Sequence, residues 1–414
     1  YEFNVTVLTD EKGRMQIYTF NHSGNNVGIV NTDQNENIKR SYGKQTNYYK
    51  IRNEDIGTGK VNKPVSDKTY VKTVKNYIRN SSFEENIPVT FSTSKLTETI
   101  VDDTAVTGKH SLKLSTPFAW KMKTMQFQVP KGNYYTFSTY MKNDCDLLFT
   151  LYYDDSDNQR NHTYISFPHH DVFTRSSLTI FYPETAISEL FLEITFMEQG
   201  TLYIDDLQLE EGETASLNNM ISNSNFEDGL KNWDIKATRV NDPAQVEIDS
   251  KASIVNLDHG ITALKLIGEP DKSEILTRTI PISGKKGDLF DLYFWYKNHG
   301  IMTQYGPVSR HALVSFQYVE GAPTIDTFPQ IALHTDNEKW QLFHSSFGAV
   351  HDYNSIQITI FNVESVNELY LTGFSLFKAI GQDNFMYDNF GNLKEYNDSQ
   401  NQIYQYEYDK NNQL

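Results

Sequence analysis

Cysteine is nearly absent from this sequence, because Cys145 is the only one in 414 residues. A single cysteine excludes a disulfide within the chain, a zinc site with several cysteine ligands and a Cys-x-x-Cys redox pair. Cys145 also lies between Asp144 and Asp146, and neighbouring carboxylates raise the pKa of a thiol. We therefore interpret Cys145 as a half-buried structural residue and not as a nucleophile.

Basic residues are scarce relative to acidic ones, with 37 Lys and Arg against 53 Asp and Glu and a net charge of -16. Nucleic-acid-binding proteins present a basic field to the phosphate backbone, so we expect no nucleic-acid partner. Long apolar runs are also missing, and no stretch approaches the roughly 18 apolar residues of a membrane-spanning helix. We therefore expect no membrane insertion.

Aromatic residues, in contrast, are abundant: 25 Phe, 26 Tyr and 4 Trp make up 13% of the chain. Aromatic and β-branched residues are favoured in strands, and many short runs of Thr, Val, Ile and Tyr occur along the sequence. With only 22 Gly and 12 Pro, the composition is typical of neither a collagen-like nor a disordered chain. The sequence predicts an all-β fold.

A short pattern recurs at both ends of the chain: an aromatic residue, any residue, an aromatic residue, Asp or Asn, two further residues, then Gly or Asn. Its copies occupy residues 18–25, 385–393 and 406–414. Aromatic residues two positions apart share one face of a strand, Asp or Asn hydrogen-bonds its own turn, and Gly or Asn takes the left-handed position. Each copy predicts a strand ending in a tight turn, and we expect the strand at 15–20 to pair with the C-terminal copies.

This pattern, with Asp10-x-x-Gly13-Arg14 ahead of the first copy, resembles the YD repeats of RHS proteins, the large secreted or surface-displayed toxins and adhesins related to the teneurins. The resemblance implies that 1–75 is a YD-repeat-type β segment with a linker and that 382–414 consists of YD-repeat strands. It also implies a bacterial protein that is secreted or displayed on the cell surface, with the remainder of the same RHS polypeptide as a partner. We interpret the chain as a piece of such a protein. Unrelated β-hairpins in a Tyr-rich chain are the alternative.

A longer repeat fills the middle of the chain. Residues 76–84, with the pattern Asn-x-x-x-Asn-x-x-Phe-Glu, recur 143 positions later at 219–227. Further landmarks follow in the same order in both copies: 111–114 and 263–266, the strands after Gly132 and Gly287, 192–196 and 356–360, and 202–209 and 369–376. The offset between the copies has grown to 167 at the last landmark. This growth indicates loop insertions in the second copy, whose strands keep the same order. The repeat predicts two duplicated β domains, 76–216 and 217–381.

The repeated Asn-x-x-x-Asn-x-x-Phe-Glu, the central Gly before an aromatic strand ending in Lys, and the closing Tyr-x-Asp-Asp-Leu-x-Leu resemble the jelly-roll carbohydrate-binding modules of glycan-degrading enzymes and surface proteins. The resemblance implies two tandem jelly-roll β-sandwiches. It also implies attachment to a glycan or a cell-surface polysaccharide. The same sandwich serves elsewhere as a spacer, so a purely structural role without a ligand is the alternative.

Strand alternation indicates where a sugar could bind. In the strand at 134–142 the core-facing residues alternate with Tyr140 and Lys142, and Trp295 and Lys297 take the same positions in the second copy. The following strands place further residues on the polar face, namely Tyr152, Glu193, Gln317 and Gln357. If these strands are neighbours, each copy has an aromatic ring beside amide, hydroxyl or carboxylate groups in one groove, a mixture that suits a sugar. An ordinary solvated face is the alternative.

The resemblance also implies one structural calcium ion. Modules of this class often bind it through a Glu after the strand-start Phe and an Asp of the closing strand, together with backbone carbonyls. The first copy keeps these elements in Glu84 and in Asp205 with Asp206, whereas the second has Thr372 and Gly373 in place of the Asp pair. The resemblance therefore implies calcium in the first domain only.

Strand parity groups Asp205 with Tyr203, Leu207 and Leu209, which we expect to lie in the core. A carboxylate buried there needs either a cation or several hydrogen-bond donors. The parity therefore favours a metal ligand at Asp205, with a hydrogen-bonded strand cap as the alternative.

Signatures of catalysis are missing. The sequence has no His-Glu-x-x-His, nucleophile elbow, Walker loop or Gly-x-Gly-x-x-Gly. Glycoside hydrolysis needs two carboxylates across a cleft, and Glu193 has no acidic counterpart in the second copy. We therefore expect a non-catalytic segment of an RHS-type protein whose modules attach to glycans, with a glycan-active enzyme as a further alternative.

Overall fold

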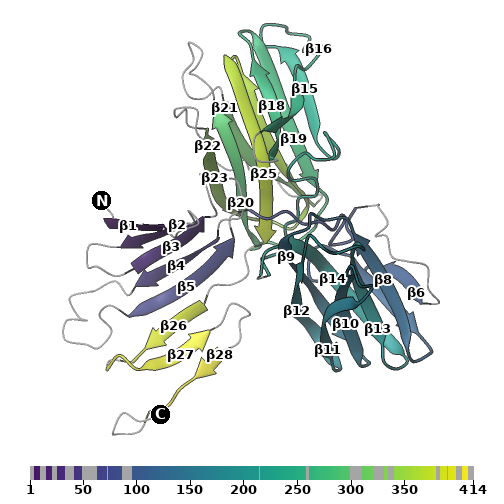
Figure 1. Ribbon diagram of the computed structural model, residues 1–414. Helices are drawn as coiled ribbons and strands as arrows, with labels where there is room; N and C mark the ends of the chain where they lie inside the picture. The colour runs from purple at the N-terminus through teal and green to yellow at the C-terminus, as the bar shows by residue number, and fades with distance from the viewer. Residues whose placement is uncertain are drawn as a thin grey trace. The chain divides into compact units, whose positions relative to one another are not determined.

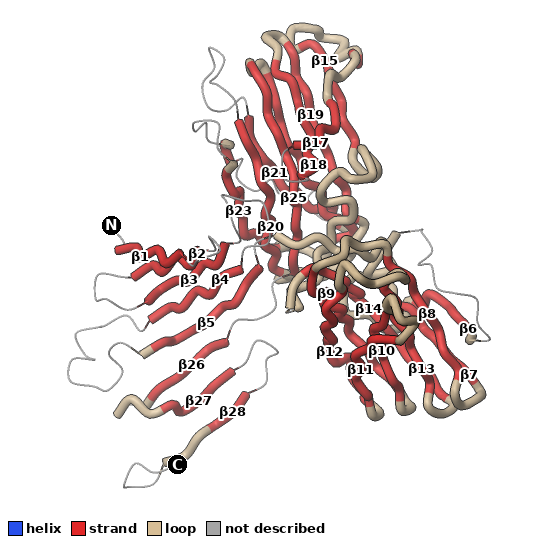
Figure 2. The backbone as a smooth tube through the Cα atoms, viewed as in Figure 1, coloured by secondary structure: helices blue, strands red, loops and turns tan. Residues whose placement is uncertain are grey.

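The computed structural model describes residues 4–9, 15–20, 26–32, 42–48, 63–71, 73–85, 96–213, 215–257, 261–298, 310–319, 331–333, 340–378, 383–388, 390–397 and 403–408. Every regular element in these ranges is a β-strand (Figures 1 and 2). Within these ranges we find no helix with the length and apolar character needed to cross a membrane. The all-β prediction is confirmed.

The chain divides into two compact units, one formed by Tyr1–Thr73 with Lys378–Leu414 and the other by Val74–Phe377. The first unit contains an antiparallel sheet with the order β1-β2-β3-β4-β5-β26-β27-β28 (Figure 1). Its strands are β1 Asn4–Thr9, β2 Met15–Phe20, β3 Asn26–Thr32, β4 Tyr42–Tyr48, β5 Pro64–Val71, β26 Asp383–Tyr387, β27 Leu393–Asn397 and β28 Ile403–Gln405. Strands from both ends of the sequence thus share one sheet.

The two ends meet where β5 pairs with β26, with Asp67 opposite Asp383 and Ser66 opposite Asn384. The expected pairing of the strand at 15–20 with the C-terminal copies is wrong, because β2 lies between β1 and β3. Consecutive strands joined by short connections pair with each other first, which leaves β5, the last of the N-terminal series, to receive β26.

The copy of the short pattern at 385–393 forms the turn that its residues predict. Asp388 accepts hydrogen bonds at Oδ1 from the N–H groups of Phe390 (2.8 Å) and Asn392 (2.9 Å). Gly391 has a φ of 84°, in the left-handed region that favours glycine. Across the strands, Tyr396 stacks on Phe385 at 5.2 Å. The turns of the copies at 18–25 and 406–414 lie outside the described residues.

Within Val74–Phe377, the first sandwich consists of two antiparallel sheets. The β10 sheet has the order β11-β10-β13-β8, and the β9 sheet has the order β12-β9-β14-β7-β6. Their strands are β6 Thr97–Val101, β7 Ser111–Thr116, β8 Lys121–Phe127, β9 Asn133–Asn143, β10 Leu147–Asp154, β11 Arg160–Phe167, β12 His170–Tyr182, β13 Leu190–Phe196 and β14 Gly200–Glu211. Inward-facing residues of both sheets, including Phe137 and Phe149, form one core.

The second sandwich repeats this strand order. Its β24 sheet runs β16-β15-β19-β24-β21-β22 and its β20 sheet runs β17-β18-β25-β20-β23. The strands are β15 Asp234–Arg239, β16 Glu247–Ile248, β17 Ser253–Leu257, β18 Ile261–Gly268, β19 Lys272–Ile280, β20 Leu289–Asn298, β21 Arg310–Tyr318, β22 Ile331–Ala332, β23 Gln341–Gly348, β24 Tyr353–Val363 and β25 Asn367–Lys378. Apart from β15 and β16, each strand has a counterpart in the same place, so the tandem jelly-roll prediction is confirmed.

The closing strand of the first sandwich carries a β-bulge, and in the second the alternation reverses at the matching position, because Leu371 and Phe374 are both fully buried. The register between β14 and β9 shifts between Asp205 and Gln208, and Asp206 has a φ of 51°. Gly373 stands 167 positions later in β25 with a φ of 65°. Ile204 before the bulge and Leu207 after it are both fully buried, so the inserted residue reverses the alternation of the strand.

This bulge makes the predicted parity of Asp205 wrong. Asp205 lies opposite Tyr140, and Tyr203 lies opposite Lys142. Directly opposed residues share a face, so both point to the outer side of the β9 sheet. Tyr203 is half-exposed there, whereas Asp205 is buried by a loop that crosses it.

The first Asn of the repeated pattern ties the start of each sandwich to its closing strand. Asn219 donates from Nδ2 to the carbonyls of Phe374 (3.0 Å) and Val74 (2.7 Å). Its Oδ1 accepts from the N–H groups of Ile221 (3.1 Å) and Leu376 (3.0 Å). Asn76 makes equivalent bonds in the first sandwich, to the carbonyl of Leu207 and from the N–H groups of Ile78 and Leu209. The motif is therefore a structural clamp.

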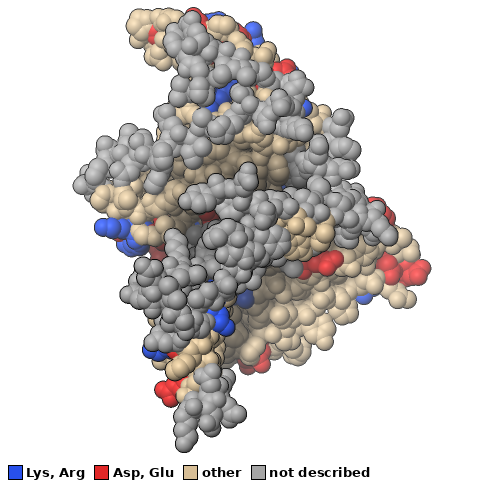
Figure 3. Space-filling model, turned by 90° about the vertical axis from the view of Figure 1, so that its left-hand side faces the viewer, with Lys and Arg blue, Asp and Glu red and all other residues tan. Residues whose placement is uncertain are grey.

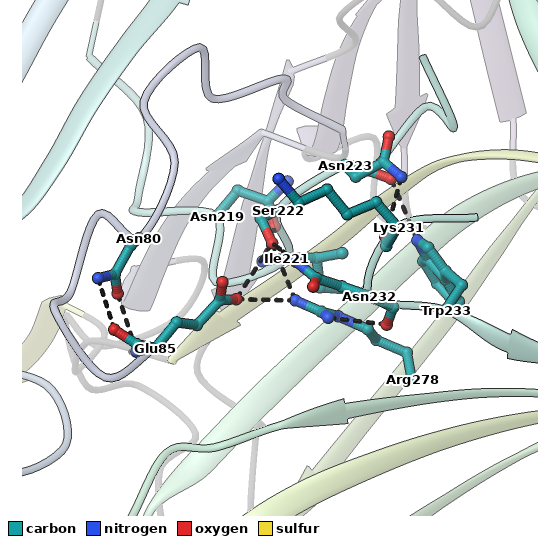
Figure 4. Close-up of polar contacts among 10 residues, drawn as sticks. All are labelled: Asn80, Glu85, Asn219, Ile221, Ser222, Asn223, Lys231, Asn232, Trp233 and Arg278. Atoms are coloured by element: carbon teal, nitrogen blue, oxygen red, sulfur yellow. Dashed lines mark hydrogen bonds and ion pairs between the residues drawn. The ribbon is translucent and has the colours of Figure 1, made fainter. Parts of the chain in front are cut away.

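Arg278 joins the two sandwiches (Figure 4). Its side chain is 4% exposed, and its Nη2 lies 3.0 Å from Glu85 Oε1 of the first sandwich and 2.9 Å from Ser222 Oγ of the second. Nη1 donates to the carbonyl of Asn232 (2.8 Å). A buried charge with its partner removed is costly, so this pair holds the 73–85 segment against the second sandwich.

The clamp yields a stability prediction. Asn219→Ala leaves two buried N–H groups and two carbonyls without their partner, and we expect a loss of about 3 kcal/mol in the free energy of unfolding, measured by urea denaturation. Asn225→Ala, in the same loop, is the control and is expected to cost less than about 0.5 kcal/mol. Equal effects of the two substitutions would contradict the clamp.

Candidate functional site

The predicted sugar-binding residues lie on two different sheets. Tyr140 and Lys142 belong to β9, whereas Tyr152 and Glu193 belong to β10 and β13 of the other sheet. The inner faces of the two sheets share one core, so their outer faces point in opposite directions. The predicted single groove is therefore wrong, because sequence parity does not reveal which strands share a sheet.

The same division occurs in the second sandwich. Trp295 and Lys297 lie on β20, whereas Gln317 and Gln357 lie on β21 and β24 of the opposite sheet. Gln357 is opposite Ser315, and Gln317 is next to it across the strand pair, opposite Ser355. The equivalence between copies is thus preserved, but each copy presents two separate faces.

The outer side of the β10 sheet combines aromatic and polar residues in two adjacent rows that cross β11, β10, β13 and β8. We call this surface the β10 face. One row contains Tyr164, Thr150, Glu193 and Thr124, and the next contains His162, Tyr152, Phe191 and Gln126. Strands are about 4.8 Å apart, so each row spans about 14 Å. Four strands thus build one extended surface.

Aromatic rings on the β10 face are held in defined positions. Tyr152 stacks on Phe191 with ring centroids 5.1 Å apart and an angle of 13°. The guanidinium of Arg160 lies 3.9 Å above the Tyr152 ring. Tyr164 is 61% exposed, and His162 stacks beside it at 6.1 Å. Tyr152 is therefore covered and supports the face, whereas Tyr164 offers its ring to solvent.

Hydrogen-bonding groups lie beside these rings. Glu193 is half-buried on β13, with Thr150 and Thr124 on either side of it. At the β8 edge, Gln126 and Gln128 both donate to the carboxylate of Glu189. An exposed ring with carboxylate, hydroxyl and amide groups nearby can cover the apolar face of a sugar and bond its hydroxyls.

Sequence reasoning found Tyr152 and Glu193 but missed Tyr164, His162 and Arg160. The signal was present, because 160–167 alternates polar or aromatic residues with inward-facing ones. The sequence analysis assigned no strand to this segment. Tyr164 is the most exposed of the tyrosine and phenylalanine rings on this face.

In the second sandwich, Gln357 lies at a shallow hollow of about 560 Å³ on the outer side of the β24 sheet, which also borders Trp233, Lys236 and Thr277. The indole N–H of Trp233 donates to the carbonyl of Asn223 (3.1 Å), and its ring packs on Phe226. Trp233 is thus mainly a core residue. This face has fewer exposed rings than the β10 face.

Tyr140 and Lys142 on the outer side of the β9 sheet have cationic and aromatic neighbours. The Arg175 guanidinium lies 5.6 Å from the Tyr140 ring centroid, and burial raises the pKa of the Tyr140 hydroxyl. Lys142 Nζ lies 5.9 Å from the ring of Tyr203. Trp295 and Lys297 are half-buried at the matching positions of β20.

Glu84, Asp205 and Asp206 all hold segments of backbone. Glu84 Oε1 accepts from the N–H groups of Lys109 and His110, both at 2.6 Å. Asp205 Oδ2 accepts from those of Val106 (2.7 Å) and Thr107 (3.0 Å). The 104–110 loop is therefore fixed from two sides.

The second Asp of the pair is also satisfied. Asp206 accepts from Thr107 Oγ1 (2.6 Å) and Asn218 Nδ2 (2.8 Å). Burial, and then the charge of Asp206, raise the pKa of Asp205 well above its usual range. Both carboxylates are buried, and each accepts hydrogen bonds from the 104–110 loop.

These carboxylates do not fit a calcium cage in the described arrangement. Calcium takes six to eight oxygen ligands, whereas the oxygens of Glu84 and Asp205 face N–H donors. Among the residues whose side chains the structure describes, no three His, Cys, Asp or Glu groups are placed to share a metal ion. Calcium binding by Glu84, Asp205 and Asp206 stays a prediction.

A Ser-His-Asp group that the sequence did not reveal lies on the outer side of the β20 sheet. His344 Nε2 is 3.2 Å from Asp291 Oδ1 and 3.3 Å from Ser346 Oγ. A nucleophilic relay uses the two ring nitrogens separately, one toward the acid and one toward the serine. Here the same nitrogen faces both, so the arrangement suits a surface hydrogen-bond cluster.

Comparison with known proteins gives no family assignment: no family model matches the sequence, and no curated protein matches it significantly. Among solved structures, the CBM22-1-CBM22-2 tandem domain of Paenibacillus barcinonensis Xyn10C is 15% identical, with 73% of this chain and 98% of that one covered and a TM-score of 0.29. Its CBM22-1 xylan-binding domain is 20% identical, with 34% and 98% covered and a TM-score of 0.29.

The enzymatically active domain of bacteriophage CBA120 tailspike protein 4 is 19% identical, with 33% of this chain and 21% of that one covered, again with a TM-score of 0.29. Because these TM-scores are low, the fold assignment rests on the strand order of the two sandwiches and not on the likenesses.

The loop-anchoring role of Asp205 predicts a stability change that does not depend on calcium. Asp205→Ala leaves the N–H groups of Val106 and Thr107 unpaired, so we expect the first sandwich to lose about 2 kcal/mol in urea denaturation. If these carboxylates only anchor the loop, EDTA leaves the wild-type transition unchanged. The calcium site would instead be established if EDTA lowered the free energy of unfolding of the wild-type first sandwich. This effect would have to be absent from Asp205→Ala and from the second sandwich.

Cys145 is more deeply buried than the sequence predicts, with 1% of it exposed. Burial, helped by Asp144, raises the pKa of its thiol to about 12. We therefore expect iodoacetamide at pH 8 to leave the native protein unmodified and to alkylate Cys145 only in denaturant, as mass spectrometry would show. Rapid alkylation of the native chain would contradict this.

Proposed function

We propose that the two sandwiches are non-catalytic carbohydrate-binding modules and that the first binds a neutral polysaccharide on the β10 face. The observation that carries this proposal is the exposed Tyr164 ring beside Glu193 and the hydroxyls of Thr150 and Thr124. A sugar residue stacked on Tyr164 brings its hydroxyls toward these groups. The face is pre-formed, so little ordering opposes binding.

The shape of the β10 face favours a chain over a single sugar. Its rows cross four strands, and Arg160 and Tyr152 continue the surface beyond Tyr164. An open surface of this length leaves both ends of a polysaccharide free to extend. Internal segments of a polymer are therefore the ligands that this geometry suits.

We further propose that the chain is a segment of a large secreted or surface-displayed bacterial RHS-type protein, in which the modules provide surface attachment. The Asp388 turn and the sheet shared by the two ends of the sequence support this context. The full-length gene tests it directly. YD repeats continuing on both sides, followed by a toxin domain, would support it, and a hydrolase domain beyond Leu414 would overturn it.

The binding proposal is tested by affinity electrophoresis of the 414-residue chain in gels containing xylan, β-glucan or mannan. We expect at least one of these polymers to retard the wild type. Tyr164→Ala removes the exposed ring and should weaken binding about tenfold.

Tyr134→Ala is the matched control, because Tyr134 is 43% exposed on the outer side of the opposite sheet. It should bind as the wild type does. Absence of retardation by every polymer, or equal weakening by the two substitutions, would contradict binding on the β10 face.

A further inference from the structure

The outer side of the β9 sheet presents a tyrosine between two lysines. Tyr203 on β14 lies directly opposite Lys113 on β7 and Lys142 on β9. The ammonium groups of Lys113 and Lys142 are 5.3 and 5.9 Å from the centroid of its ring. All three side chains are half-exposed. Arg175, beside Tyr140 on the neighbouring strand, extends the cationic surface.

These cations have no acidic partner among the residues that the structure describes. Arg175 donates to Ser138 Oγ and to the carbonyl of Ser216, and the two lysines contact the Tyr203 ring. The chain as a whole has a net charge of -16, and charges of both signs are scattered over the face drawn in Figure 3. Asp205 lies on the same face, opposite Tyr140, but it is buried and bonded to the 104–110 loop. The two lysines and Arg175 therefore form a local site for an anion beside that loop.

The second sandwich carries the same arrangement in a neutralised form. Lys265 lies opposite Tyr370, at 5.8 Å from its ring, as Lys113 lies opposite Tyr203. Here, however, Glu368 forms an ion pair with Lys265 and accepts from the Tyr370 hydroxyl (2.5 Å). The residue at the place of Glu368 in the first sandwich is Thr201, two positions before Tyr203. One position thus decides whether the cation is paired.

We propose that Lys113, Tyr203 and Lys142 form a second glycan site, specific for polysaccharides that carry carboxylates. The lysines lie two strands apart, about 10 Å, so successive uronate groups of one polymer can pair with both while a sugar ring lies on Tyr203. Arg175 offers a further ion pair at the edge. The β10 face instead carries the carboxylates of Glu193 and Glu189, which repel an acidic polymer. One sandwich thus binds acidic glycans on its β9 sheet and neutral glycans on its β10 face. This inference rests on the proposed function only in taking the ligand to be a glycan.

The test is titration calorimetry of the 414-residue chain with polygalacturonate at low salt. We expect Lys113→Gln and Lys142→Gln each to weaken binding about fivefold, the upper range for an exposed ion pair. Thr201→Glu, which copies the second sandwich, should also weaken it. Added salt should weaken wild-type binding.

The second sandwich supplies the controls. Lys265→Gln should leave binding unchanged because Glu368 already occupies Lys265, whereas Glu368→Thr should add a second site. No binding of polygalacturonate, or equal losses for Lys265→Gln and Lys142→Gln, would overturn the inference.

The neutral polymers measured in parallel separate this inference from the proposed function. If xylan, β-glucan or mannan still binds through Tyr164 while polygalacturonate does not bind, only the acidic site is wrong. If polygalacturonate binds with the expected variant pattern while no neutral polymer binds, the β10 face is wrong and the acidic site stands.

Discussion

The bulge in the closing strand is the constraint on which both sandwiches depend. By inserting Asp206, or Gly373 in the second copy, the strand keeps large apolar residues in the core on both sides of the inserted position. It also places Tyr203 and Asp205 on the outer side of the sheet. Without it, either the core would lose its last two leucines or Tyr203 would leave the surface where it meets the lysines.

Much of the fold could be predicted from the sequence. The duplicated landmarks gave the two sandwiches, and the Asp388 turn follows from the short pattern. The bulge was missed, since strand alternation assumes one residue per step and Asp206 breaks it. The signal for it was Gly373 at the aligned position of the second copy. The sequence also did not show which strands share a sheet, because β9 and β10 are consecutive in sequence yet belong to opposite sheets.

The sequence therefore identified several residues of the candidate site but not how they are arranged. Tyr152 and Glu193 do lie together, but Tyr140 and Lys142 face the other way. The division has chemical meaning. One face joins stacked aromatic residues to carboxylates, and the other joins tyrosines to unpaired cations. Neighbouring charges set which sugars each face accepts, since like charges across an interface are costly.

The central claim is that a neutral polysaccharide lies on the β10 face, and hydroxyl-radical footprinting tests it most directly. The rate of side-chain oxidation is read by mass spectrometry with and without the bound polymer, at Tyr164 and at Tyr134, which are exposed on opposite sides of the sandwich. The account predicts protection of Tyr164 and an unchanged rate at Tyr134. Protection of Tyr134 with an unchanged rate at Tyr164 would contradict it.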